Sequence, residues 1–531
     1  MGDDGATSDV AFAAFHSSAT RLVSDDAAED TVSHLAAVGA SLATMEDSVI
    51  ERSLDFILFP VVGVMRRASE PETNDADANP KARARRIKTL EESLRCVSAV
   101  LRRLEPGMGE PAFIGDLFCD VVAVLARSGS DPSLDDPSSG TRSSSSSADL
   151  EDLRLAAVTC ASDVVRLIRP RTTHARALLA DKNLPAVGYA TSLLVRVAHL
   201  EASAGTKGSK AIRCAALATL RDLVRNTDDP DAWSFFLPGV VSGLAKALHA
   251  ASGSRSDEGA GPAGAADDSA STEAAIEALT AIVTCVLDDT CNVVQQRDTE
   301  HGGDAGDDVV ERLRRMAEDG REGASVLRES SSRVDEDEDE DDVASDGPPP
   351  AGADTSQAAA HLKVRRTARW LRETAPRVEQ ALIAALTPAV SHRKPSVRRT
   401  AALAAAAVIK QCSRTLRGAR RTLLECTFVA RGDAWDAVSG PATVVLDGLR
   451  SDGYVDDEVL DSIVAEALGD LPKLVRRGAA GGDGGRACAQ RAIAAMATAG
   501  SARVARMFLT KYAVRSVTCA GLAQCFAVSA D

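Results

Sequence analysis

The sequence predicts an all-α protein, built as a HEAT- or armadillo-like α-solenoid of stacked antiparallel helix pairs with disordered inserts. Apolar residues recur at helical spacing in segment after segment, and strand-like alternation is almost absent. Alanine and leucine dominate the composition and aromatic residues make up only 3%, which also favours helices. The helical segments fall into pairs of roughly 40 residues, which is the HEAT period.

Residues 361–413 show this repeat pattern most clearly. Val378 and Leu382 belong to the apolar face of a first helix, which a polar break follows. Pro395 suits the first turn of a second helix, where its missing N–H costs nothing. Val397 begins an alanine-rich face that lets a partner helix approach closely. Because one pair cannot bury both of its faces, we expect neighbouring pairs on either side.

At 531 residues the chain exceeds one ordinary core, so several domains or a continuous solenoid are expected. Composition divides it into three parts. Residues 9–296 form a predicted N-terminal solenoid, 297–357 a disordered acidic insert, and 358–529 the continued solenoid. Two stretches of the first part are rich in Ser, Gly, Ala and Asp and predict flexible loops, residues 128–149 and 250–271.

Most of the net charge of −16 lies in the insert. Residues 300–357 contain 19 acidic and 6 basic residues, so the remainder of the chain is close to neutral. Residues 335–342 are all acidic, and Ser332 lies three residues before them. An acidophilic kinase accepts such a serine, so Ser332 is a candidate phosphorylation site, with chance occurrence as the alternative.

Two apolar segments contain prolines with structural consequences. Residues 53–68 read as a helix with Pro60 inside, where a proline removes a hydrogen bond and should kink or restart the helix. Residues 233–249 predict a single helix that is entered through an aromatic cluster and a Pro-Gly pair.

No catalytic, cofactor-binding or metal-ligating residue set is apparent in the sequence. The chain lacks the phosphate loop G-x-x-x-x-G-K-[ST], the G-x-S-x-G elbow and the zinc motif H-E-x-x-H. The 11 cysteines include no C-x-x-C, and no Cys/His group has zinc-finger spacing. Most cysteines fall within apolar helical patterns, so we expect buried free thiols in a reducing compartment. The sequence therefore predicts no enzymatic activity, no metal and no cofactor.

The sequence also predicts a soluble intracellular protein. The N-terminus is acidic and has no apolar core, so it is not a signal peptide. The longest apolar run, residues 401–409, is far short of the ~20 residues that a membrane span requires. We therefore expect a cytoplasmic protein, with the nucleus as a second location and no membrane partner.

Residues 365–421 contain three basic clusters, which are Arg365, Arg366, Arg369 and Arg372; Arg393, Lys394, Arg398 and Arg399; and Arg414, Arg417, Arg420 and Arg421. These clusters could contact phosphate or an acidic protein surface. A solvated helix face, or an internal partner for residues 335–342, is the alternative. Because the chain has few aromatic residues for base stacking, nucleic acid is the less favoured partner.

Three stretches of the chain resemble the Tel-two-interacting protein one family. The segment with Phe59 and Pro60 resembles that family's Y-I-L-F-P-L. The segment with Phe236 and Pro238, followed by an amphipathic helix, resembles its F-L-P-G. These stretches occur in the family's order and with its spacing, allowing for the insert.

The third stretch contains Trp370, which resembles the tryptophan of the family's R-x-x-x-W. In the helix pair that follows, Pro395, Val397 and Arg398 open the second helix, where the family has W-K-V-R. Lys394 departs from the capping Asp that many HEAT repeats carry before the proline. The Ser-rich and acidic inserts are also peculiar to this sequence.

The resemblance implies a scaffold subunit of the TTT (Tel–Tti–Tti) co-chaperone complex. That complex works with the heat-shock-ninety system and supports the maturation and stability of phosphatidylinositol-3-kinase-related kinases such as mTOR, ATM and ATR. The implied partners are the other TTT subunits, large kinases and chaperone machinery. Two alternatives are a nuclear-transport carrier, which would need a ladder of Trp and Asn, and a nucleic-acid-associated HEAT protein. With only 3 tryptophans, the chain has no such ladder.

The resemblance extends only to the N-terminal half of that family. The last predicted helix, residues 504–528, still carries an apolar face, whereas a solenoid should end in a polar capping repeat. We therefore expect a fragment, a shortened gene model, or a chain end that docks on another protein.

Overall fold

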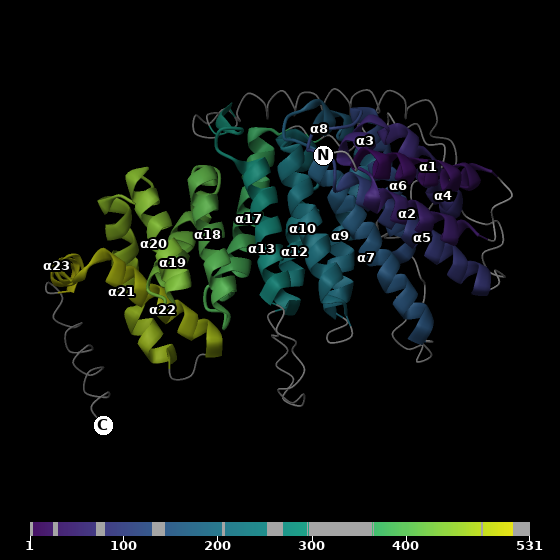
Figure 1. Ribbon diagram of the computed structural model, residues 1–531. Coiled ribbons are helices and arrows are strands. Elements are labelled where there is room, and N and C mark those ends of the chain that lie inside the picture. Colours follow the sequence, from purple (N-terminus) through teal and green to yellow (C-terminus); the bar gives the residue numbers. More distant parts are fainter. Residues whose placement is uncertain are drawn as a thin grey trace, which may run out of the picture.

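The computed structural model describes residues 4–512 except for 25–29, 71–79, 130–143, 204–207, 252–268, 295, 297–363, 365 and 479–481. Within these residues the chain forms 20 helices and no strand, which confirms the all-α prediction. Figure 1 shows the helices side by side, from the N-terminal repeats in purple to the C-terminal repeats in yellow. The candidate phosphorylation site Ser332 lies outside the described residues.

The helices form two rows that lie back to back. The inner row consists of α2 (Thr31–Thr44), α5 (Pro80–Leu101), α7 (Ser144–Leu167), α10 (Lys210–Thr227), α13 (Ser269–Leu287), α18 (Pro395–Cys412) and α20 (Asp436–Ser451). The outer row consists of α1 (Asp4–Val23), α4 (Leu54–Ser69), α6 (Pro111–Gly129), α9 (Leu184–Ser203), α12 (Leu237–Ala251), α17 (Ala368–Ala389), α19 (Arg417–Arg431) and α22 (Gly482–Ala499). Each helix packs against the next in its row and, except for α22 at the end, against a partner in the other row, which is the arrangement of an α-solenoid.

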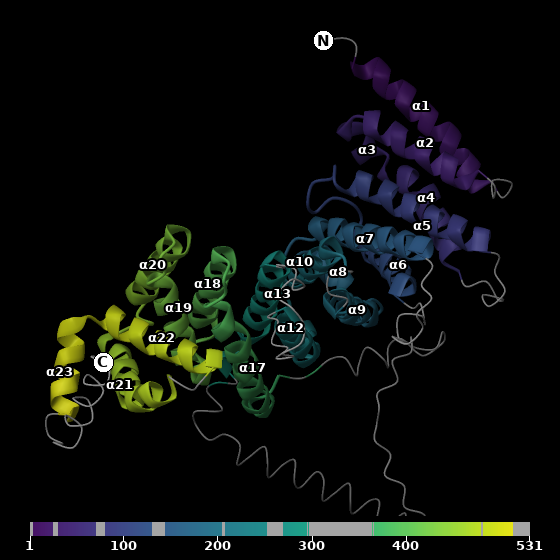
Figure 2. The ribbon, with the colours of Figure 1, turned by 90° about the horizontal axis from the view of Figure 1, so that it is seen from below.

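The remaining helices connect or end the rows. Short connecting helices are α3 (Asp47–Arg52), α8 (Thr173–Leu178) and α11 (Pro230–Ser234). At the C-terminal end, α21 (Asp457–Gly478) packs against α22, and α23 (Ser501–Tyr512) packs against both. Figure 2 shows that the rows bend, with α10, α13 and α18 toward the inside of the bend and α9, α12 and α17 toward the outside. The outer row therefore presents a convex face.

A continuous hydrophobic core fills the space between the two rows. Helix α18 illustrates how composition permits this. Ala401, Ala404 and Ala405 are buried, together with Val397 and Val408, so α13, α19 and α20 can all approach closely. Pro395 is the first residue of α18, as its missing N–H predicts. The small side chains thus allow one helix to be covered on most of its circumference.

One of the two outcomes predicted at Pro60 does not occur. Helix α4 does not restart at Pro60 but continues through it. Ile57, Leu58 and Val61 around this proline are buried, and tertiary packing of this kind supplies most of a helix's stability in proteins.

Conversely, the helix predicted at residues 233–249 is two helices, α11 and α12. Asp229 caps α11 by accepting hydrogen bonds from the amides of Asp231 and Ala232, at 3.0 and 3.1 Å. Pro238, the second residue of α12, has no N–H to continue the preceding turn.

Helix α13 is a long and largely apolar helix of the core. By length and composition, α13 is the one described helix that could cross a membrane, and 67% of its most apolar window is buried inside the protein. It packs between α10, α12 and α18, as the core helix of a solenoid does.

Asp289 connects the helices on either side of the acidic insert. Its carboxylate accepts hydrogen bonds from the amides of Arg414 and Thr415, both at 2.9 Å, and from the Thr415 hydroxyl at 2.8 Å. Gln296 donates to the same carboxylate at 3.1 Å and to Thr415 Oγ1 at 2.7 Å. The segment after α13 therefore caps the turn between α18 and α19, although more than 120 residues separate them.

Candidate protein-binding surface

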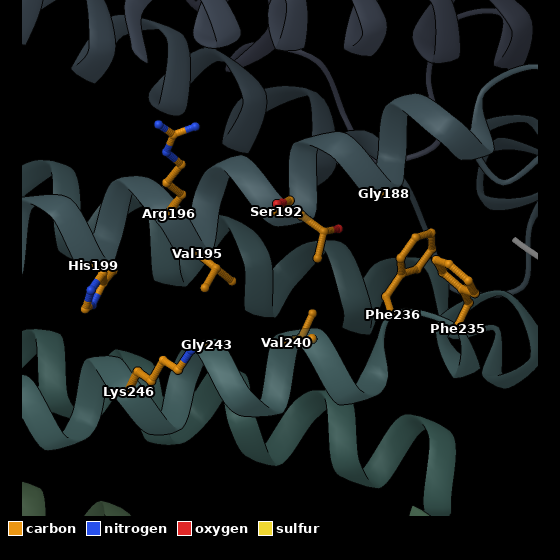
Figure 3. A pocket seen from close by; sticks show the side chains of 12 residues that line it. Gly188, Ser192, Val195, Arg196, His199, Phe235, Phe236, Val240, Gly243 and Lys246 are labelled. Carbon is orange, nitrogen blue, oxygen red and sulfur yellow. The ribbon is translucent and has the colours of Figure 1, made fainter. Parts of the chain in front are cut away.

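Helix α12 forms the floor between two hollows of the outer row, one beside α9 and one beside α17. Gly239 and Ser242 on its surface leave open space, whereas Gly243 lets α9 approach, because a Cβ there would lie 2.4 Å from Val195 Cγ1. On the α9 side the hollow has a volume of ≈ 400 Å³. Phe235 and Phe236 close one end of it, and His199 and Lys246 lie at the other, as Figure 3 shows.

Close helix packing fixes the walls of this hollow. A Cβ atom at Gly188 of α9 would lie 2.5 Å from Cε1 of Phe236, so only glycine allows the ring to sit there. Trp233 and Phe235 hold the Phe236 ring with edge-to-face contacts, at centroid distances of 5.9 and 5.3 Å. Trp233 is itself fully buried and donates from Nε1 to Thr227 Oγ1 at 2.8 Å. The aromatic end of the trough is therefore a rigid feature.

A second, larger hollow of ≈ 790 Å³ lies on the α17 side of α12. Val241 and Ala245 of α12 line it, opposite Val378 and Ala381 of α17. His199 and Lys246 line both hollows, so the two are neighbours on α12. We call the surface that they form together the α12 trough, and define it by the residues that line these two hollows.

The α12 trough is basic. Its lining contains Arg196, His199, Lys246 and Arg377, and no carboxylate among the described residues. In Figure 3, Arg196 extends over α9 on the side away from α12, so Lys246 and Arg377 carry the charge nearest the floor.

The carboxylates on the wall helices have other partners. Glu201 of α9 accepts from Arg154 at 3.1 Å. On α17, Glu373 pairs with Arg369 at 2.9 Å, and Glu379 accepts from the Gly418 amide at 2.7 Å. The field over the trough floor is consequently positive.

The family-motif residues fall on different parts of the solenoid. Phe236 and Pro238 line the α12 trough. Phe59 is 72% exposed on α4, where it borders an apolar hollow of ≈ 430 Å³ beside α1, whereas Pro60 is buried. Trp370 lies in the first turn of α17 and packs partly against the core; its amide donates to Thr367 Oγ1 at 3.1 Å.

Several arginines of residues 365–421 are structural. Arg366 donates to Asp231 Oδ1 at 2.7 Å and is only 10% exposed, so it joins α11 to the start of α17. Arg420 donates to the Tyr454 carbonyl at 2.6 Å, and Arg398 pairs with Asp433. These contacts lie within the solenoid, a role that the sequence did not predict, and residues 335–342 lie outside the described residues.

The cysteines whose side chains the structure describes are free, and half of them are buried. Burial raises the pKa of Cys96, Cys160 and Cys426 to about 12, and that of Cys119 to about 11. A thiol with so high a pKa is a poor nucleophile at neutral pH. No group of three or more His, Cys, Asp or Glu side chains suited to a metal ion occurs within the described part of the chain.

The sequence pointed to Phe236 and Pro238 but not to the trough they border. The signal that could have found it is the run of small residues on one face of α12, beside a lone lysine. Lys246 and Arg377 were missed because they lie on different helices, on either side of the acidic insert.

No curated protein matches the chain. A family profile described as the TTI1 N-terminal TPR domain matches residues 12–434. Both the HEAT and the TPR descriptions denote solenoids of helix pairs, which is the fold observed. Since the match covers well over half of the chain, the protein belongs to the TTI1 family, the Tel-two-interacting protein one family that its motifs resemble.

Proposed function

We propose that this protein is a non-enzymatic scaffold that supports the maturation and stability of phosphatidylinositol-3-kinase-related kinases. It would act as the TTI1-type subunit of a TTT complex, in concert with the heat-shock-ninety system, in the cytoplasm and the nucleus. The observation that carries this proposal is the family match over residues 12–434. Family membership supports a scaffold role in such a complex. That the scaffold acts on these kinases, together with the heat-shock-ninety system, is our further proposal.

The fold supplies what a scaffold requires. A bent two-row solenoid offers an extended surface on which several proteins can bind without competing. The α12 trough is the feature of this surface best suited to a protein partner, because its floor is apolar and its edges are charged.

Affinity purification of the full-length chain from its own cells tests this function. We expect two other helical-repeat proteins and at least one very large kinase to be recovered, at levels above a purification of an unrelated tagged solenoid. Recovery of neither class of partner would refute the proposal. Recovery of the two helical-repeat proteins without a kinase would retain the scaffold and refute its link to kinases.

A further inference from the structure

The α12 trough combines an apolar floor with positive charge. The exposed Phe235 and the partly exposed Val195 contribute apolar surface on the α9 side, and the partly exposed Ala245 and Ala381 do so on the α17 side. Exposed cations stand beside this floor, and no acidic side chain of the described residues lines it. A binding partner must therefore supply both apolar groups and negative charge to be complementary.

We propose that the α12 trough binds an amphipathic helix of a partner protein, with apolar residues on one face and Asp or Glu along the edges of that face. This inference rests on the proposed scaffold function, and it specifies the chemistry of one partner segment. The partner helix would lie over α12, between α9 and α17, as an additional helix on the outer row.

The shape of the trough favours a helix as the occupant. Helix α12 has 15 residues, so its floor extends for about 22 Å at 1.5 Å per residue. A groove lined by helices has no strand edge to extend, and such grooves bind helices through apolar residues at i, i+3, i+4 and i+7. Gly239 and Ser242 leave the depth that these side chains need.

The positive edges favour acidic residues in that helix. Lys246 of α12 and Arg377 of α17 both line the hollow on the α17 side, so carboxylates along that edge of the partner helix would meet a cation. The acidic run of this same chain, residues 335–342, has the matching charge but contains no apolar residue. It could neutralise the edges without filling the floor, so a partner helix is the better complement.

Fluorescence anisotropy with designed peptides tests this proposal. The probes are labelled helical peptides of about 15 residues, which share leucines at i, i+3, i+4 and i+7 and carry Glu, Gln or Lys at the flanking positions. We expect the full-length chain to bind the Glu peptide about tenfold more tightly than the Gln peptide at low salt, and the difference to shrink as salt is raised.

Variants of the chain locate the binding. Lys246→Glu with Arg377→Glu should weaken the Glu peptide about tenfold and strengthen the Lys peptide. Lys210→Glu with Arg399→Glu makes the same change of net charge on exposed positions of the inner row, and should leave both affinities unchanged. Gly239→Leu should abolish binding by filling the trough, since a Cβ at Gly239 meets no atom within 4 Å and the variant can fold.

Equal affinities for the Glu and Gln peptides, or the same loss in both charge-reversed variants, would overturn the proposal. In a further variant, all acidic residues of 335–342 are replaced by Asn or Gln. If only this variant binds the Glu peptide, the chain's own insert is the occupant of the trough, which also overturns the proposal. Because these peptides contain no cellular partner, the outcome is independent of whether the scaffold purification recovers kinases.

Discussion

Arg398 and Asp433 form a buried bidentate ion pair. Arg398 donates from Nε to Oδ2 at 2.6 Å and from Nη2 to Oδ1 at 3.0 Å, and the two side chains are only 13% and 9% exposed. Arg398 also donates to the carbonyl of His392 at 2.8 Å, and Asp433 accepts from the amide of Trp435 at 2.9 Å. The pair thus joins the turn before α18 to the turn before α20, and so connects two neighbouring repeats.

Removing one partner of this pair should loosen both turns. Arg398→Ala leaves a buried carboxylate unpaired, and we expect a loss of about 3 kcal/mol of local stability. Arg398→Lys should lose less, because it retains the charge without the bidentate geometry. Hydrogen exchange of the α18 and α20 amides measures the change. Arg399→Ala, at an exposed neighbour, is the control, and equal effects of Arg398→Ala and Arg399→Ala would contradict the role of the pair.

The same pair should make stability depend on pH. Burial acts to raise the pKa of Asp433, but hydrogen bonds from Arg398 and the Trp435 amide outweigh it and leave this pKa below its ordinary value of 3.8. Because the folded state favours the ionised carboxylate, its contribution is fully present above the unfolded pKa and is lost as pH falls through the folded pKa. Asp433→Asn should therefore cost most near pH 7 and progressively less below about pH 4. Urea unfolding across this range measures the difference, and a cost that grows on acidification would contradict it.

Two glycine substitutions should have opposite effects. Gly188→Ala places a methyl group against the Phe236 ring, so we expect a loss of about 1–3 kcal/mol from overpacking. Gly448→Ala in α20 meets no atom within 4 Å, and should gain about 0.5–1 kcal/mol because alanine loses less conformational entropy in a helix. Thermal unfolding followed by circular dichroism gives both signs. A stabilising Gly188→Ala would show that the α9–α12 contact is looser than described.

The buried thiols should resist alkylation in the folded protein. Burial raises the pKa of Cys96, Cys160 and Cys426 to about 12, so at pH 8 only about one thiol in ten thousand is ionised. Mass spectrometry after iodoacetamide treatment should find these three unmodified in buffer and fully modified in urea. Rapid modification in buffer would indicate that the repeats open on the timescale of labelling.

The sequence was sufficient for the fold because helical periodicity is a local property. Val378 and Val397 lie on the buried faces that their spacing predicts, and Pro395 opens its helix. Burial of neighbouring residues overrode the predicted restart at Pro60, and that burial is not visible in the local pattern. The break between α11 and α12 was visible in the sequence but was missed. Asp229 is a helix-capping residue and Pro238 favours a helix start, but the continuous apolar run between them suggested one helix.

The site could be predicted only in part, because its residues come together through the stacking of repeats. Phe236 was identified by its motif, but the hollow beside it depends on Gly188 of another helix. Arg398 was read as part of a basic surface, since its partner Asp433 follows 35 residues later in a different turn. Lys246 and Arg377 meet only because α12 and α17 are neighbours in the outer row.

The most direct test of the central claim is the lifetime of the large kinases in cells depleted of this protein. The scaffold account predicts that kinases of the phosphatidylinositol-3-kinase-related family decline at constant messenger levels and recover when the full-length chain is restored. Kinase half-lives that stay unchanged after depletion would contradict it.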